Sequence, residues 1–234
     1  MFTALGICGS LRAGSLNAAA LSSVAELCEE AGSGWEFARE PRLDRLPFFN
    51  PDVERGPLPE PVAEFRARVA AADAVLIATP EYAHGTSGVL KNALEWLVGG
   101  GELVGKPVVL LSASPASTGG GRAQAWLRET LTVMSAEVLP QGLEIPLASA
   151  KASGGRIADP ATLDAMRELL HTLAQATAQA VAVATMQAAA QPAVVGGGGV
   201  GGARLPSSIG VRTALELGQP AFEQPPLRLG RRQA

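Results

Sequence analysis

Two segments of the chain repeat one order, which is an apolar run, a polar loop and then a helical pattern. The first loop, residues 9–17 (Gly-Ser-Leu-Arg-Ala-Gly-Ser-Leu-Asn), follows the apolar run 3–8. The second, residues 79–88 (Thr-Pro-Glu-Tyr-Ala-His-Gly-Thr-Ser-Gly), follows the apolar run 74–78. Parallel strands joined by crossover helices bring such loops to one edge of a sheet, where ligands of open α/β sheets bind. The two loops are therefore expected to hold one ligand together.

Other runs of the same kind complete the predicted fold. Strands are expected at 3–8, 35–38, 73–79, 107–112 and from 137, and helices at 15–31, 62–72, 87–98, 122–134 and 160–187. Asp159 is the expected cap of the last helix, and the segment 41–61, with its many Pro and Gly residues, is expected to be a loop. This alternation predicts an α/β fold with a five-stranded parallel sheet in the order 2-1-3-4-5.

Charge and composition change near the end of the chain. Residues 1–186 carry 14 basic and 20 acidic side chains, whereas residues 187–234 carry five and two. The second stretch includes the glycine-rich run 196–202. We therefore predict a domain over 1–186 and a flexible, weakly basic Gly/Pro-rich tail over 187–234. The net charge of −3 for the 234 residues gives no reason to expect a nucleic acid or a membrane as partner.

The chain's cysteines and apolar segments favour an intracellular protein. Two cysteines, Cys8 and Cys28, make no disulfide framework, and both are expected to be buried. No His or Cys spacing suggests a metal site. The N-terminus is expected to be a strand and not a signal peptide, and the Ala-rich run 172–190 is interrupted by glutamines. We therefore expect no membrane span and a cytoplasmic location.

The first loop has the chemistry of a phosphate site. Ser10, Ser15 and Asn17 supply short polar groups, Arg12 supplies a guanidinium, and a helix N-terminus follows. No Gly-Lys-Ser/Thr sequence follows, so this is not a Walker loop. The alternative is a capped helix, with Ser15 as the cap and Arg12 in solvent.

The second and third loops favour a flat ligand. Tyr82 is the chain's single tyrosine, and a planar heterocycle packs well against such a ring. The third loop, residues 112–122, is rich in Ser and Gly, which lets backbone approach a ligand closely. The alternatives are a surface tyrosine and a glycine-rich helix cap. No nucleophile stands beside a base in this sequence, so the reactive atoms of an enzyme here would belong to a cofactor.

Three motifs then make the chain similar to a known family. They are G-S-x-R-x-x-S-x-N at 9–17, P-E-Y at 80–82 with L-K-N-A-L-E-W at 90–96, and G-G-G-R-A-Q at 119–124. Over residues 1–186 the sequence resembles the NADPH-dependent FMN reductases, a family that also contains quinone, azo-dye and chromate reductases. The resemblance implies a flavodoxin-like three-layer sandwich with bound FMN.

The resemblance also implies the site. The FMN phosphate would lie on Ser10, Arg12, Ser15, Leu16 and Asn17, and the isoalloxazine ring between Pro80, Glu81, Tyr82 and His84 on one side and Ser114 and Gly119 on the other. No residue is assigned a catalytic role.

The implied activity is hydride transfer from NADPH or NADH to FMN, followed by electron transfer to a small acceptor, namely a quinone, flavin, azo compound or metal oxyanion. A homodimer or homotetramer is implied, with a neighbouring subunit closing the flavin site. Two alternatives are a flavodoxin-like electron carrier or flavin-binding partner protein, which is not an enzyme, and a flavin-free interaction module that keeps the fold.

Overall fold

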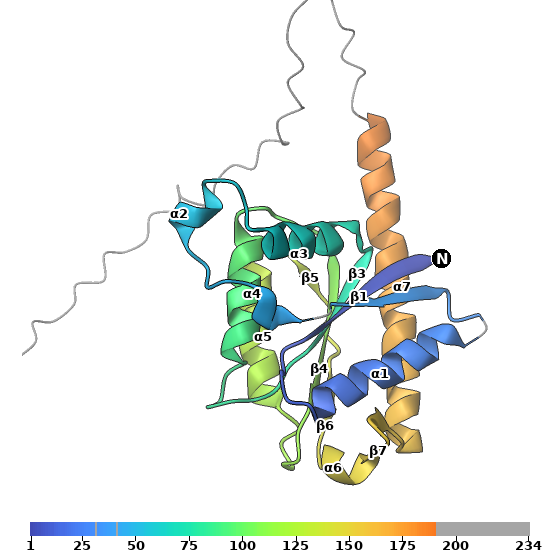
Figure 1. The fold of residues 1–234 in the computed structure, drawn as a ribbon. Helices are drawn as coiled ribbons and strands as arrows, with labels where there is room; N and C mark the ends of the chain where they lie inside the picture. Colours follow the sequence, from blue (N-terminus) through green and yellow to red (C-terminus); the bar gives the residue numbers. More distant parts are fainter. Residues whose placement is uncertain (31, 41, 191–234) are drawn as a thin grey trace, which may run out of the picture. The chain divides into compact units, whose positions relative to one another are not determined.

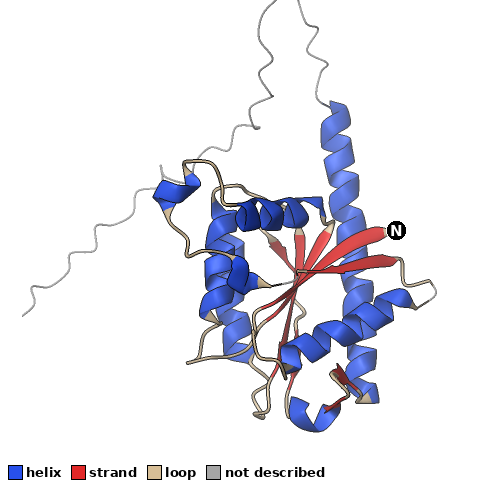
Figure 2. Ribbon diagram, viewed as in Figure 1, coloured by secondary structure: helices blue, strands red, loops and turns tan. Residues whose placement is uncertain are grey.

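The centre of the molecule is a parallel sheet. The structure is a computed structural model that describes residues 1–30, 32–40 and 42–190 (Figure 1). Its strands are β1 (Phe2–Cys8), β2 (Trp35–Arg39), β3 (Ala74–Ala78), β4 (Pro107–Ala113) and β5 (Glu137–Val138). They lie in the order β2-β1-β3-β4-β5, and each neighbouring pair is parallel (Figure 2). The predicted flavodoxin-like fold and strand order are confirmed.

Helices cover both faces of this sheet (Figures 1 and 2). Helices α1 (Leu16–Glu29) and α7 (Pro160–Ala190) cover one face, and α3 (Glu60–Ala71), α4 (Gly88–Val98) and α5 (Gly121–Val133) cover the other. Every residue of β3 is buried, as expected for an unbroken apolar strand between two layers. Two apolar cores result, one on each face of the sheet.

The fifth strand is divided into two pieces. After β5 the chain leaves the sheet and returns as β6 (Leu143–Ile145), which pairs with Leu111–Ala113 of β4. Pro140 lies in the interruption and has no N–H to donate to a ladder. The sequence indicated only where this strand starts. The return matters because β6 carries Glu144 to the edge where the ligand loops lie.

The segment 41–61, predicted to be a loop, contains short helices. These are the 3₁₀ turn η1 (Leu43–Arg45) and α2 (Pro51–Glu54). Asn92 of α4 accepts from the Phe49 N–H at 2.7 Å and donates to the Pro47 carbonyl at 3.0 Å. The segment is therefore fixed by side chains of α4, which local sequence patterns do not reveal.

A short hairpin after α6 (Ala148–Lys151) is also absent from the sequence prediction. Its strands are β7 (Ala152–Ser153) and β8 (Arg156–Ile157). The two glycines between them have positive φ angles of 59° and 78°, as a two-residue hairpin turn requires. The Ile157 N–H donates to Ser23 Oγ of α1 at 2.9 Å, which fixes the hairpin to the domain.

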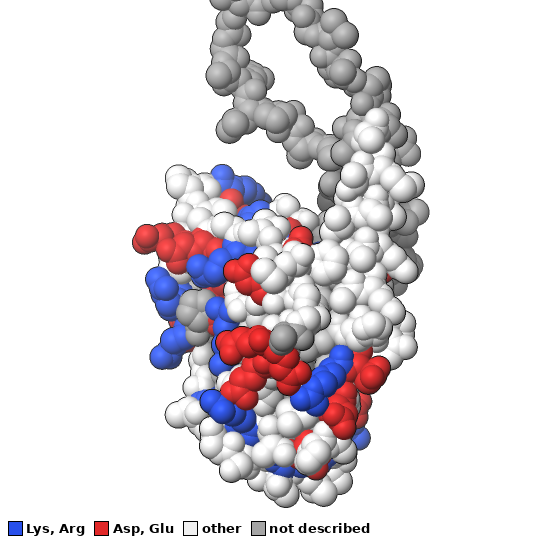
Figure 3. All heavy atoms as spheres, turned by 90° about the vertical axis from the view of Figure 1, so that its right-hand side faces the viewer, with Lys and Arg blue, Asp and Glu red and all other residues white. Residues whose placement is uncertain are grey.

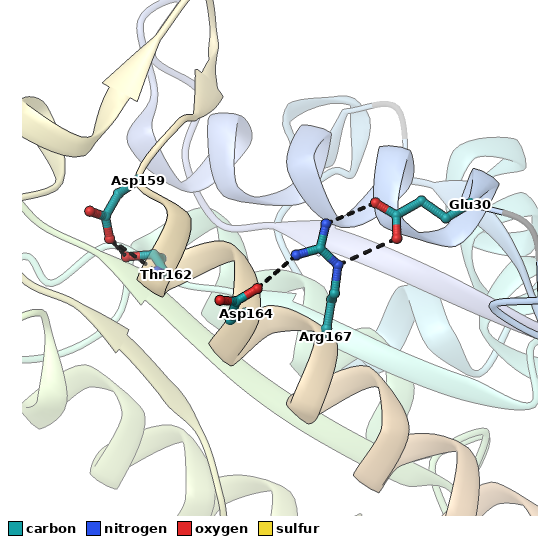
Figure 4. Close-up of polar contacts among 5 residues, drawn as sticks. All are labelled: Glu30, Asp159, Thr162, Asp164 and Arg167. Carbon is teal, nitrogen blue, oxygen red and sulfur yellow. Dashed lines mark hydrogen bonds and ion pairs between the residues drawn. The ribbon is translucent and has the colours of Figure 1, made fainter.

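Polar contacts hold the start of α7 (Figure 4). Asp159 caps the helix as predicted, because its carboxylate accepts from the Thr162 N–H at 3.0 Å, and the hydroxyl and N–H of Thr162 lower the pKa of Asp159. Arg167 donates to Glu30 at 2.9 Å and to Asp164 at 2.9 Å. The Arg167 contact lowers the pKa of Glu30. These contacts join α7 to the end of α1.

The C-terminal two thirds of α7 carry no formal charge. Residues 169–190 contain no Asp, Glu, Lys or Arg, and this part of the helix is white in Figure 3. No helix in the described ranges is long and apolar enough to cross a membrane. The predicted flexible tail, 187–234, lies almost wholly outside the described residues and stays a prediction.

Neither cysteine is in a disulfide. Cys28 is buried as expected, and burial raises the pKa of its thiol to about 11. Cys8 is only partly buried.

Candidate functional site

The loops after β1, β3 and β4 meet around one cleft at the carboxyl edge of the sheet. Nine of the eleven predicted cofactor-binding residues line it, and Ala113 and Pro115 complete its wall. The nine are Ser10, Arg12, Ser15, Leu16, Asn17, Pro80, Glu81, Tyr82 and Ser114. The other two, His84 and Gly119, lie in the same loops but not in the wall of the cleft.

The first loop is pressed against the second at Gly9. The Gly9 N–H donates to Ala78 O at 2.8 Å, and the Gly9 carbonyl accepts from Ser87 Oγ at 2.5 Å. A Cβ at this position would lie 3.0 Å from both Pro80 Cδ and Leu90 Cδ2. A side chain here would push Pro80 or Leu90 aside by a few tenths of an ångström, so glycine favours the close approach of the two loops.

The N-terminus of α1 is suited to an anion. Ser15 caps the helix by accepting from the Ala18 N–H at 3.1 Å, and the first turn contains no acidic residue. The remaining N–H groups of a first helical turn have no partner within the helix. Arg12 is exposed, and its guanidinium makes no hydrogen bond or ion pair within residues 1–30, 32–40 and 42–190. The cap and the anion site are therefore compatible, and the two interpretations of this loop do not compete.

Asn17 has a structural role that its motif does not reveal. Its side-chain amide is buried, donates to Ala113 O at 3.2 Å and accepts from the Ala113 N–H at 2.9 Å. Both polar ends of the side chain are thus used to join α1 to the end of β4. A contact of Asn17 with phosphate stays a prediction. Because both polar ends of the side chain are used, the backbone N–H of Asn17 is the group that would make this contact.

The second loop contains a strained turn. Tyr82 and Gly85 exchange two backbone hydrogen bonds of 2.9 Å, and Ala83 and His84 between them have φ angles of 49° and 63°. Positive φ at two successive residues without glycine is unfavourable and is found where surrounding contacts enforce it. The turn leaves Tyr82 about half exposed, at 47%, beside the cleft.

A contact across the loops lies beside this turn. The guanidinium Nη1 of Arg122 lies 2.7 Å from Nδ1 and 3.1 Å from Nε2 of His84. A guanidinium can only donate, and an imidazole has at most one acceptor nitrogen, so one of the two ring nitrogens accepts and the other only lies close. Glu81 accepts from the Arg122 backbone N–H at 3.2 Å, and its second oxygen lies 3.5 Å from His84 Nδ1. Arg122 was not among the predicted site residues, although it belongs to the third motif.

The third loop is closed by a buried amide. Gln124 donates to Ser112 Oγ at 2.8 Å and to Leu143 O at 3.0 Å, and Ser112 Oγ donates to Gly119 O at 2.7 Å. Gly119 and Gly120 have φ angles of 63° and 93°, which explains the glycine pair. Gln124 therefore shapes the loop without lining the cleft. The spacing in Gly-Gly-x-Arg-Ala-Gln was the sequence signal for it.

The cleft fits FMN by its chemistry. One end offers helix amides and an exposed guanidinium, which suit a phosphate dianion. The other end offers Tyr82 and backbone close to glycines, which suits a planar ring. Within the described residues there is no cluster of His, Cys, Asp and Glu able to hold a metal ion. Fold and site together define a flavin-binding α/β protein of the flavodoxin type.

Comparison with known proteins identifies the family within this class. The family model for NADPH-dependent FMN reductase matches residues 2–150, and the chain belongs to that family. It is 40% identical over 177 residues to an NAD(P)H-dependent FMN reductase of Pseudomonas aeruginosa, covering 74% of this chain and 91% of that one. It is 34% identical over 134 residues to quinone reductase of Escherichia coli K12, covering 56% and 70%.

A solved structure agrees with both. The flavoenzyme NAD(P)H:acceptor oxidoreductase FerB of Paracoccus denitrificans matches with a TM-score of 0.66 and 28% identity, covering 76% of this chain and 98% of that one. The predicted family and oxidoreductase class are confirmed, as is FMN as the cofactor.

Proposed function

We propose that this chain holds FMN in the cleft between its three loops and uses NADPH or NADH to reduce a small acceptor, best represented by a quinone or a free flavin. The observation that carries the placement is an Arg12 guanidinium without a partner in the described residues, beside the first-turn amides of α1 that the Ser15 cap leaves without a partner. The names of the relatives support a quinone or flavin as acceptor.

The residues of the chain bind and orient in this proposal. Arg12, Ser10 and the first amides of α1 hold the phosphate, and Asn17 keeps that helix end against β4. Tyr82 and the backbone of the turn that follows it position the ring. FMN, when bound, supplies the two-electron chemistry, accepting hydride and delivering electrons. Such transfer needs alignment and an open ring face, so no side chain is assigned as acid or base.

Two further features belong to the proposal. A homodimer or homotetramer would close the open side of the cleft, and the free thiols of Cys8 and Cys28 fit a reducing compartment such as the cytoplasm.

The deciding experiment is an anaerobic titration of the FMN-loaded protein with NADPH, followed by flavin absorbance. Rapid bleaching, with reoxidation by a quinone, is the expected result. A bound flavin that neither NADPH nor NADH bleaches would overturn the reductase and favour the electron carrier. Failure to retain FMN would overturn the placement of the cofactor.

A further inference from the structure

Two arginines at the edge of the cleft differ from the other arginines of residues 1–190. Each of the others contacts a carboxylate or a backbone carbonyl, as with Arg167 to Glu30 or Arg128 to the Leu139 carbonyl at 2.6 Å. Arg12 and Arg122 do neither in the part of the chain that the structure describes. Both are exposed, and both lie at the carboxyl edge of the sheet.

One of the two is accounted for by the proposed function. FMN has a single phosphate, and Arg12 lies at the end of the cleft that suits it. Arg122 follows the third loop beside Glu81 and His84, outside the wall of the cleft, and its guanidinium is available to a different anion. The other substrate of the reaction carries one, because NADH has a pyrophosphate and NADPH has an additional 2′-phosphate.

We propose that Arg122, held in place by His84, binds a phosphate group of the dinucleotide donor. This inference rests on the proposed function. His84 is a positioning residue. Its imidazole contacts only Nη1 of the Arg122 guanidinium, so the other guanidinium donors have no partner in the described residues. An imidazole nitrogen that accepts this contact holds the arginine without cancelling its charge, whereas a carboxylate would cancel it.

Two carboxylates lie at the helix end near Arg122, and neither forms an ion pair with its guanidinium within the described residues. Glu81 accepts from the Arg122 backbone N–H, and a Cβ on Gly121 would lie 2.7 Å from Glu144 Oε1. Both therefore lie at the N-terminus of α5, whose partial positive charge offsets theirs. The strain at Ala83 and His84 is consistent with a turn shaped to present the imidazole to Arg122.

The test compares three variants of the FMN-loaded protein. Arg122→Gln removes the charge, and Arg122→Lys keeps it without the fork. Lys151→Gln is the matched control, because its side chain makes no hydrogen bond or ion pair within the described ranges and also lies beyond the carboxyl end of the sheet. We expect Arg122→Gln to raise KM for the donor about 10- to 100-fold, as loss of a charged hydrogen bond does, with kcat nearly unchanged. Arg122→Lys should recover part of this, and Lys151→Gln should match the wild type.

The donors separate the two sources of phosphate. A higher KM for NADPH alone identifies the 2′-phosphate, and an equal rise for NADH identifies the pyrophosphate. Calorimetry of 2′,5′-ADP and ADP binding to the oxidised protein gives a readout that does not depend on turnover. His84→Asn, which tolerates the positive φ, should weaken the same binding by a smaller factor.

Two outcomes would overturn the inference. One is an unchanged KM for both donors in Arg122→Gln with FMN still bound. The other is loss of FMN from that variant, which would assign Arg122 to the flavin. The wild-type protein distinguishes these failures from failure of the proposed function. If NADPH bleaches its bound flavin, the proposed function holds in either case, and if neither NADPH nor NADH does, the proposed function is wrong.

Discussion

The loops after β1 and β4 look alike in sequence but differ at the helix that each one enters. Both are rich in Ser and Gly, and both precede a helix N-terminus with an arginine nearby. At α1 the first turn contains no acid, and Arg12 has no partner in the described residues. At α5 Glu81 accepts a backbone N–H, and Glu144 lies against Gly121.

This difference supports the orientation that we propose for the ligand. A helix N-terminus that already faces two carboxylates has little capacity left for a phosphate dianion, whereas an open one stabilises it. In the proposed function this places the phosphate end of FMN at β1 and the ring at β3 and β4. Small residues alone do not make an anion site, because the groups that approach from other strands decide whether the amides stay available.

The largest effect is expected from Asn17→Leu, which removes the bridge between α1 and β4. The Ala113 N–H and carbonyl would be left buried without partners, so we expect a loss of about 2 to 4 kcal/mol in the free energy of unfolding. FMN affinity should fall as well, because the helix end is no longer fixed. Urea denaturation and fluorescence titration with FMN measure the two quantities.

Asn92→Leu is the matched control for this bridge, because Asn92 makes the same kind of buried contact to Pro47 and Phe49 outside the cleft. It should lower stability while keeping FMN affinity. Equal loss of affinity in both variants would show that the effect of Asn17 is only global.

Arg12→Ala should act in the opposite manner, on binding and not on stability. Its guanidinium makes no contact within the described chain, so the melting temperature of the apo-protein should not change. The dissociation constant for FMN should rise about 10- to 100-fold, the range for a charged hydrogen bond. Arg55→Ala, at a distant exposed ion pair with Asp52, is the control. Unchanged FMN affinity in Arg12→Ala would contradict the orientation of the ligand.

Much of this arrangement could be predicted from the sequence. The five strands, their order and the three loops follow from apolar runs and crossover rules, which act locally or by topology. Ser15 and Asp159 are caps at the predicted helix ends because capping depends on neighbours two or three residues away. The motifs placed nine of the eleven site residues in the wall of the cleft.

What the sequence did not show depends on distant partners. The amide of Asn17 is bound to a residue 96 positions away, and the guanidinium of Arg122 to one 38 positions away. The helices within 41–61 and the return of β6 to β4 likewise need contacts from other elements. The carboxylates at the N-terminus of α5 are a further example, because Glu81 comes from the loop after β3 and Glu144 from β6, both distant in sequence from that helix.

A smaller effect is expected when the two carboxylates at the N-terminus of α5 are replaced by amides. In the double variant Glu81→Gln, Glu144→Gln, two charges that favour this helix end are removed. We expect a loss of about 0.5 to 1 kcal/mol in stability at low ionic strength. Sulfate should then raise the melting temperature more than it does in wild type, because an anion can occupy the vacated position. Glu137→Gln on exposed β5 should show no such gain, and an equal gain in both would remove the contrast between the two helix ends.

The smallest effect concerns pH and lies far from both loops, at Arg167. Its contact lowers the folded-state pKa of Glu30 below the ordinary value of 4.5, so this pair stabilises the fold above about pH 4.5 and stops doing so as pH falls through the folded value. Arg167→Gln should therefore lower the melting temperature slightly at pH 7, and the difference from wild type should shrink at pH 3. The shift is small because both side chains are about half exposed, at 46% and 52%. Arg167 also contacts Asp164, so the variant Glu30→Gln tests the Glu30 contact alone. In this variant the melting temperature should depend less on pH between pH 7 and pH 3. A constant difference between wild type and Glu30→Gln from pH 7 to pH 3 would show that charge at Glu30 does not hold α1 to α7.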